Sequence, residues 1–172
     1  MTQNQLAADL QAVLTEFAEA LSAIPDDALN TVPFNGSWTP GQVARHINLS
    51  NSGFLQVLNG STKPTERPHD AAIEKLRAIL LDFDARRQAP EFIVPPAIPY
   101  QKDRLLASIE KVKEALPPVF DLDLTATCTA FELPGVGHAT RLEALHFMLY
   151  HTQRHLRQLR NIAATLQEAK TE

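Results

Sequence analysis

The sequence contains one cysteine, Cys128, and no long run of apolar residues. A single cysteine cannot form an internal disulfide, so no feature of the chain requires an oxidising compartment. No stretch reaches the roughly 20 apolar residues that cross a bilayer. Residues 1–9 are polar and lack the basic and apolar segments of a signal peptide. These absences predict a soluble cytoplasmic protein with no membrane partner.

Concentrated positive charge is also missing. The chain has 16 Lys and Arg against 20 Asp and Glu, which gives a formal net charge of −4. Its basic residues are dispersed apart from the pair Arg86-Arg87, which we interpret as part of a solvated turn. Proteins that bind nucleic acids present a basic patch or stripe, so we expect no nucleic-acid partner.

Glycine is scarce beside proline, with 6 Gly and 12 Pro, which favours stiff connections over flexible ones. The 172 residues are 44% hydrophobic, enough for one domain, residues 1–172, with a substantial core. Apolar residues recur at three- and four-residue steps, a pattern that predicts α-helices. The four long helices are expected over 5–24, 40–58, 101–116 and 140–167. A shorter helix is expected over 71–84, and Asp70 could cap it.

The helix over 40–58 has an explicit start. Thr39 fits the N-cap, Pro40 the first helical position and Gln42 the third, which together form a capping box. Residues 60–100 then separate this helix from the next one. A connection of that length allows the two helices to run parallel, where a short loop would make them antiparallel. The expected architecture is therefore all-α, a four-helix bundle with a long crossover between helices two and three.

Residues 121–130 alternate between apolar and polar types, which predicts an extended segment with one face packed down. The only candidate partner strand in the sequence is Phe92-Ile93-Val94. Pro134-Gly135-Val136-Gly137 is expected to turn the chain into the last helix.

Two histidines, His151 and His155, occupy the edge of the apolar stripe in the last helix. Residues four apart lie on one face of a helix, so both imidazoles can reach one point. Such a pair is either metal-ligating or a pair of core groups satisfied by hydrogen bonds, and the spacing alone does not decide. The intervening Thr152-Gln153-Arg154 lacks the glutamate of the metalloprotease pattern.

A third histidine, His46, points inward from the first turns of helix two, together with Ser50. In helical bundles, metal ligands come from side chains on facing helices. Three imidazoles without a fourth protein ligand suit a site that keeps a position open for water or substrate. The candidate metal ligands are therefore His46, His151 and His155.

Three segments carry a resemblance to a known family. They are Gly36-Ser37-Trp38-Thr39-Pro40-Gly41-Gln42-Val43-Ala44-Arg45-His46, Leu133-Pro134-Gly135-Val136-Gly137-His138-Ala139-Thr140 and His151-Thr152-Gln153-Arg154-His155-Leu156. In content, order and spacing, the chain resembles the DinB/YfiT-like metalloenzymes, the DinB superfamily. The resemblance implies a four-helix bundle with a long crossover and a divalent metal on His46, His151 and His155. It also implies a link to thiol transferases that use bacillithiol or mycothiol, and to a mycothiol-dependent isomerase.

The other histidines and Cys128 are expected to have structural roles and not to bind the metal. His69 and His138 are expected in exposed loops, and His146 is expected to point away from the other two histidines of its helix, at the surface or a boundary. Cys128 is interpreted as a small buried apolar residue because no neighbour in sequence would lower its pKa. Trp38 packs the loop before helix two onto the bundle or forms a wall of a binding pocket.

The function predicted from these features is that of a metal-dependent enzyme. The first expectation is thiol-dependent S-transfer to small electrophiles, with zinc or nickel as the metal and a low-molecular-weight thiol as cosubstrate. The alternatives are a metal-dependent hydrolase and a non-catalytic metal- or ligand-binding bundle. The expected partners are a small-molecule substrate and, as an option, a second copy of the chain. The sequence assigns no catalytic residue and no thiol-binding residue.

Overall fold

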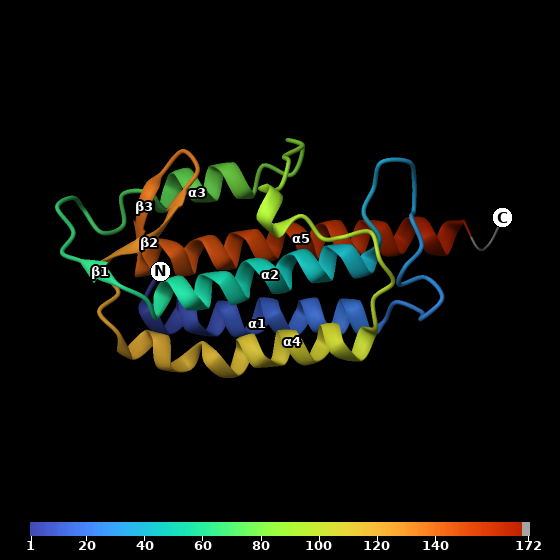
Figure 1. The fold of residues 1–172 in the computed structure, drawn as a ribbon, viewed down its shortest axis with the longest axis horizontal. Helices are drawn as coiled ribbons and strands as arrows, with labels where there is room; N and C mark the ends of the chain where they lie inside the picture. Colours follow the sequence, from blue (N-terminus) through green and yellow to red (C-terminus); the bar gives the residue numbers. More distant parts are fainter. Residues whose placement is uncertain (170–172) are drawn as a thin grey trace.

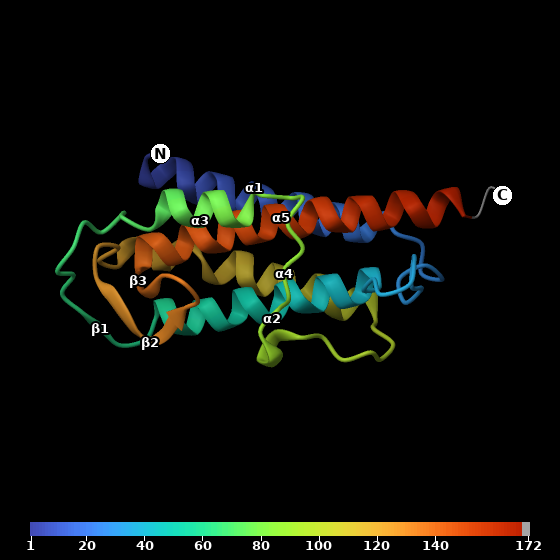
Figure 2. The same cartoon turned by 90° about the horizontal axis from the view of Figure 1, so that it is seen from above.

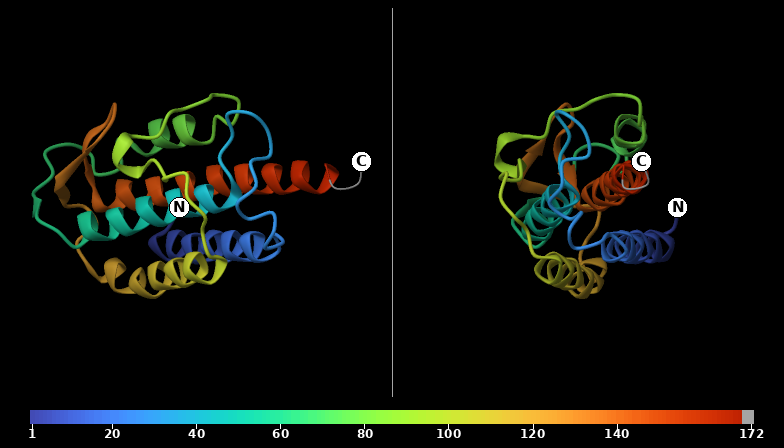
Figure 3. Two further views of the ribbon diagram at one scale, coloured as in Figure 1. Left: turned by 45° about the vertical axis from the view of Figure 1, so that its right-hand side comes forward. Right: turned by 90° about the vertical axis from the view of Figure 1, so that its right-hand side faces the viewer.

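Four long helices lie side by side along the molecule: α1 (Gln3–Ser22), α2 (Pro40–Leu58), α4 (Lys102–Ala115) and α5 (Arg141–Glu168) (Figure 1). The computed structural model describes residues 1–169, so the last three residues of the predicted 1–172 domain lie outside the described residues. Helices α1 and α2 each contact both α4 and α5, and the end view in Figure 3 shows the four around a common centre.

The direction of the helices follows from the lengths of their connections. Figure 1 shows α1 and α5 running one way and α2 and α4 the other. The long segment between α2 and α4 lies outside the four helices, and it contains the short helix α3 (Ile73–Leu80), which packs on α5. From α3 the chain crosses over α5 to the 3-10 helix η1 (Glu91–Ile93), which contacts α2 (Figure 2). This connection allows α2 and α4 to run parallel, as the sequence predicts.

Side-chain caps fix the start of the two helices that carry the candidate ligands. The Thr39 hydroxyl accepts from the Gln42 amide, and the Gln42 side chain accepts from the Thr39 amide, so the predicted capping box is present. Thr140 and Glu143 form a second capping box at the start of α5. Each box satisfies two amides that would otherwise lack partners at a helix start. Both helices that carry the candidate ligands therefore begin at defined residues.

The core lies between the four long helices. Its fully buried side chains include Phe17 of α1, Ile47 of α2, Ile109 of α4 and Leu145 and Met148 of α5. The predicted helical class is therefore correct for most of the chain. Within the described residues, no helix has both the length and the apolar character needed to cross a membrane.

A small sheet adds to the helices and was only partly predicted. Strand β2 (Thr127–Leu133) pairs antiparallel with β1 (Thr62–Lys63) and with β3 (Gly137–Thr140). The extended segment expected at 121–130 begins later and ends later. The 3-10 helix η2 (Pro117–Asp121) takes its first residue, and the Asp123 side chain accepts from the Thr125 amide in the turn that follows. The hairpin turn between β2 and β3 depends on Gly135 and Gly137, whose φ angles of 74° and 83° favour glycine.

The predicted strand partner Phe92-Ile93-Val94 was wrong. Residues 91–93 form η1, and Val94 is followed by Pro95 and Pro96, which lack the amide hydrogens that a strand ladder needs. Strand β3 reaches β2 through a short turn instead.

The predicted helix over 71–84 is shorter than expected. Helix α3 starts after Ala72, and the Asp70 side chain does not cap it. The carbonyl oxygens of Leu80, Asp82 and Ala85 accept hydrogen bonds from the Arg154 guanidinium, which holds the chain in a turn where the helix was expected to continue.

Candidate metal centre

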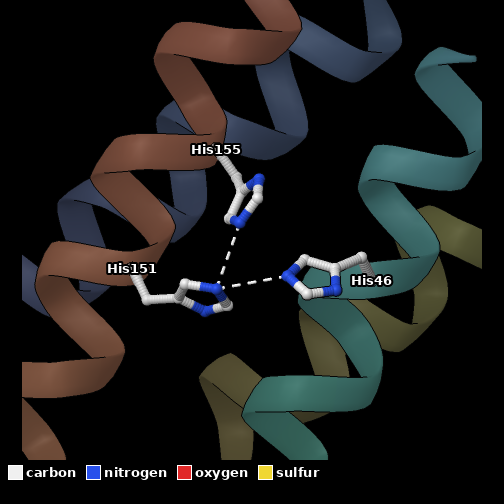
Figure 4. A group of neighbouring side chains, drawn as sticks. All are labelled: His46, His151 and His155. Carbon is white, nitrogen blue, oxygen red and sulfur yellow. Dashed lines mark hydrogen bonds between the residues drawn. The ribbon is translucent and has the colours of Figure 1, made fainter. Parts of the chain in front are cut away.

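Three imidazoles from two facing helices point to one place. His46 lies in the second turn of α2, and His151 and His155 lie one turn apart in the middle of α5. Helices α2 and α5 are in direct contact, and Figure 4 shows the three rings converging in the space between them. The structure thus brings together all three residues that the sequence selected as candidate metal ligands.

The ε nitrogen of His151 lies close to the ε nitrogens of both other rings. His151 Nε2 is 3.2 Å from His46 Nε2 and 3.1 Å from His155 Nε2. The three residues offer ligand atoms that all lie within 4.8 Å of one another. Two nitrogens bound to zinc at 2.0–2.1 Å and a tetrahedral angle lie about 3.3–3.4 Å apart. The observed spacing is therefore close to that of a metal coordination shell.

Each ring has a second partner at its outer nitrogen. His46 Nδ1–H donates to the Ile93 carbonyl of η1 at 2.9 Å, and His155 Nδ1–H donates to Gln158 Oε1 at 2.7 Å. His151 Nδ1 lies 3.2 Å from the Ser50 hydroxyl, which can donate or accept. In a neutral imidazole one nitrogen carries the hydrogen and the other accepts, so the oxygen partners place the lone pairs of His46 and His155 at Nε2.

This arrangement leaves the ε nitrogens short of donors. With both outer nitrogens protonated, His46 and His155 present lone pairs toward His151 Nε2. A hydrogen on His151 Nε2 satisfies one of them at a time and leaves the other lone pair buried without a donor, which costs free energy. A divalent cation between the rings would bond to all three nitrogens at once. The donor set therefore fits a metal ion such as zinc, for which neutral imidazole is a common ligand.

Burial keeps the three imidazoles neutral, the form in which they bind metal. Removal from water lowers the pKa of His151 well below 6.5, and the neighbouring His155 and His46 lower it further. Burial, followed by the effect of His46, lowers the pKa of His155 to about 3. Burial also lowers the pKa of His46, against the opposing effect of its bond to the Ile93 carbonyl. Protons therefore compete weakly for these nitrogens near neutral pH.

An aromatic side chain flanks the cluster at the start of α2. The Trp38 ring is 5.0 Å from the His46 ring and stacks on the His155 ring at 6.5 Å with an 18° angle between the planes. Trp38 is half-buried, and it immediately precedes the Thr39 cap. Of the two roles expected for Trp38, these ring contacts match a wall of the site, although the side chain also packs against the core cluster.

The family model of the DinB superfamily matches residues 9–159, a span that includes most of the chain and all three histidines. The chain belongs to the DinB superfamily. No curated protein and no solved structure matches it significantly. The family assignment made from the sequence segments is therefore confirmed.

The other three histidines of this DinB-superfamily chain lie outside the cluster. His69 is exposed in a turn, as expected. The prediction for His138 was wrong, because it lies in β3, half-buried, and its Nε2 is 3.2 Å from Glu132 Oε1. His146 was expected at the surface or a boundary, but it is 4% exposed. Its Nδ1–H donates to the Leu142 carbonyl at 2.9 Å, a bond along its own helix that makes burial tolerable.

Cys128 is buried in β2, as the sequence interpretation held, and burial raises the pKa of its thiol. A buried thiol with a raised pKa is a poor nucleophile. Within residues 1–169, the only group of three or more His, Cys, Asp or Glu side chains with metal-binding geometry is the histidine cluster, and it contains no carboxylate.

The sequence did not reveal several of the groups that contact the three histidines. Gln158 follows His155 by three residues, a spacing that places both on one side of a helix, so it could have been found. Phe147 precedes His151 by four residues, and its ring stacks on the His151 ring at 5.1 Å. The Ile93 carbonyl could not have been found, because a backbone oxygen from a proline-rich segment has no sequence pattern of its own.

Proposed function

We propose that His46, His151 and His155 bind one divalent metal ion, zinc or nickel, and that the protein is a metal-dependent enzyme acting on a small molecule. The observation that carries the proposal is the convergence of three ε nitrogens, with His151 Nε2 at 3.1 and 3.2 Å from the other two. Membership of the DinB superfamily supports it. When bound, such an ion supplies Lewis acidity and lowers the pKa of a thiol or water that reaches it.

The residues of the chain contribute position and exclusion of water. The Ile93 carbonyl and the Gln158 side chain hold His46 and His155 with their ε nitrogens directed inward. Ser50 contacts the outer nitrogen of His151. Partners of this kind fix ring orientation and tautomer in histidine metal sites. Trp38 and Phe147 cover two sides of the cluster with apolar rings.

The reaction we propose is S-transfer from a low-molecular-weight thiol to a small electrophile. The only cysteine is buried and its pKa is raised, so the sulfur nucleophile would come from a separate thiol molecule. Transfer from a thiol ranks ahead of hydrolysis because no carboxylate in the described part of the chain joins the cluster to take a proton from water.

A second candidate is a metal-binding protein without catalysis. The same lack of a carboxylate in the cluster favours it, because many metal-dependent enzymes pair the ion with an acid or base side chain. Homodimer formation remains a prediction, and light scattering of the purified protein would test it.

Metal analysis of protein purified without a His-tag and without added metal is the first experiment, and we expect one ion per chain. The metal-loaded protein is then given a chromogenic electrophile with a panel of small thiols, and separately a panel of esters and amides. Metal-dependent turnover that requires thiol and disappears in His151→Ala supports transfer, and turnover without thiol supports hydrolysis. Metal binding without turnover in either panel supports the non-catalytic candidate.

A further inference from the structure

A row of aromatic rings leads from the histidine cluster to the surface. The Phe147 ring of α5 stacks on the His151 ring at 5.1 Å, with 30° between the planes. The Phe54 ring of α2 lies 4.7 Å from Phe147, and the Phe131 ring of β2 lies 6.1 Å from Phe54. The Phe92 ring of η1 completes the row at 5.9 Å from Phe131. We call Phe54, Phe92, Phe131 and Phe147 the aromatic row.

The aromatic row is most exposed at the end far from the histidine cluster. Phe54 is 8% exposed, Phe147 and Phe131 are half-buried, and Phe92 is 67% exposed. The rings come from four separate elements, α5, α2, β2 and η1, that the fold assembles beside the site. Aromatic rings 4.5–7 Å apart attract one another and accept a further ring in the same geometry. The half-buried rings next to His151 can therefore contact an apolar group.

The histidine cluster has few charged neighbours that could bind a charged substrate. Within residues 1–169, Arg154 is the one Lys, Arg, Asp or Glu side chain whose charge acts on His151 and His155. Its guanidinium already donates to the carbonyls of Leu80, Asp82 and Ala85. Trp38 adds another aromatic surface beside the rings of His46 and His155.

We propose that the aromatic row binds an uncharged aromatic or extended apolar group of the substrate and thereby positions its reacting end at the three histidines. This inference rests on the proposed function, because it assumes that the substrate reacts at the histidine cluster. Phe92 is 67% exposed beside Phe131, and its helix η1 also contacts the histidine cluster, because the Ile93 carbonyl accepts from His46. Apolar residues exposed together beside a polar site are typical of ligand binding.

The test uses tag-free protein loaded with Co²⁺, whose visible absorption reports ligands that reach the ion. Two thiols of similar acidity are titrated, benzyl mercaptan and 2-mercaptoethanol, and a dissociation constant is obtained for each from the absorption change. We expect benzyl mercaptan to bind at least about tenfold more tightly. Phe92→Ala should reduce that preference by about two- to tenfold, the size of one aromatic contact, without changing the affinity for 2-mercaptoethanol.

Two controls make the result decisive. Phe83→Ala removes another partly exposed phenylalanine, one that contacts Arg157 and no ring of the aromatic row, and it should leave both constants unchanged. Because Phe92 is exposed, its replacement should not unfold the protein, and circular dichroism checks this. Equal affinity for the two thiols, or equal weakening of both by Phe92→Ala, would overturn the inference and leave the metal site intact. Absence of Co²⁺ absorption in the unaltered protein would overturn the proposed metal site and this inference with it.

Discussion

His155 depends on a side chain of its own helix for its orientation. Its Nδ1–H donates to Gln158 Oε1 at 2.7 Å, whereas the Nδ1–H of His46 donates to a backbone carbonyl that no substitution removes directly. Gln158→Leu keeps the size of the side chain and removes the acceptor. We expect metal affinity to fall by about 10–100-fold, the usual cost of losing an outer partner of a histidine ligand. Isothermal titration with Zn²⁺ measures it.

Two variants separate positioning from packing at Gln158. Gln158→Glu retains an acceptor oxygen, so affinity should be close to that of the unaltered protein. Gln153→Leu makes the same change on the same helix at a residue outside the cluster and should have no effect. If Gln158→Leu bound Zn²⁺ as tightly as Gln153→Leu, the positioning role would be disproved.

Replacing one of the three histidines should lower metal affinity more than replacing the outer hydrogen-bond partner of a histidine. Replacement of an outer partner lowers metal affinity by at most about 100-fold. We expect a larger loss of metal affinity in each of His46→Ala, His151→Ala and His155→Ala. The bundle should stay folded because its core consists of apolar side chains on all four long helices. Metal analysis after dialysis and far-ultraviolet circular dichroism measure the two outcomes. Full metal content in all three variants would refute the assignment.

Among the elements, the start of α5 is held by a buried carboxylate. Glu143 is fully buried, and both of its oxygens lie 2.6 Å from the guanidinium nitrogens of Arg67. It also accepts from the amides of Thr140 and Ala72 at 2.9 and 2.8 Å. Burial alone would raise the pKa of Glu143, but the hydrogen bonds outweigh it and bring the pKa below 4.5. The carboxylate thus connects the sheet, the segment before α3 and the helix that carries two of the candidate ligands.

Glu143→Gln is expected to lower the free energy of unfolding by about 2 kcal/mol at neutral pH, because it replaces the charge-assisted hydrogen bonds between a buried carboxylate and the partly exposed Arg67 with neutral ones. Since the folded pKa lies below the unfolded value of 4.5, the charge contributes stability above pH 4.5 and loses it as the pH falls through the folded pKa. The difference between the two proteins should therefore shrink below pH 4.5. Urea unfolding at several pH values measures it, with the exposed Glu19→Gln as control. A difference independent of pH would contradict this account.

Elements whose causes are local could be predicted from the sequence. The capping box of Thr39 and Gln42 and the four-residue spacing of His151 and His155 depend on neighbours along the chain, and the structure has both. The elements that were missed depend on distant contacts. Residues 91–93 form a 3-10 helix that contacts α2, and α3 ends at Leu80, whose carbonyl accepts a hydrogen bond from Arg154. His146 is buried, and periodicity within one helix does not reveal which side of that helix other parts of the chain cover.

At the scale of the whole molecule, the cluster connects helices that are far apart in the chain. His46 and His151 are separated by 105 residues. Because an ion bound to both α2 and α5 requires the folded arrangement, it stabilises the native state in proportion to its affinity and concentration. Free metal at 100 times the dissociation constant adds about 2.7 kcal/mol, which for a chain of this length corresponds to about 5–10 °C in the melting temperature.

Thermal unfolding of the metal-free protein with increasing Zn²⁺ tests this coupling. The melting temperature should rise with each increase in free Zn²⁺ in the unaltered protein and stay nearly constant in His46→Ala, because that variant leaves both remaining ligands on α5 and removes the connection to α2. His69→Ala, which removes an exposed histidine outside the cluster, should behave like the unaltered protein. The fluorescence of Trp38, the only tryptophan, provides a local signal beside the site. An equal rise in His46→Ala would mean that Zn²⁺ stabilises the fold from somewhere other than the space between α2 and α5.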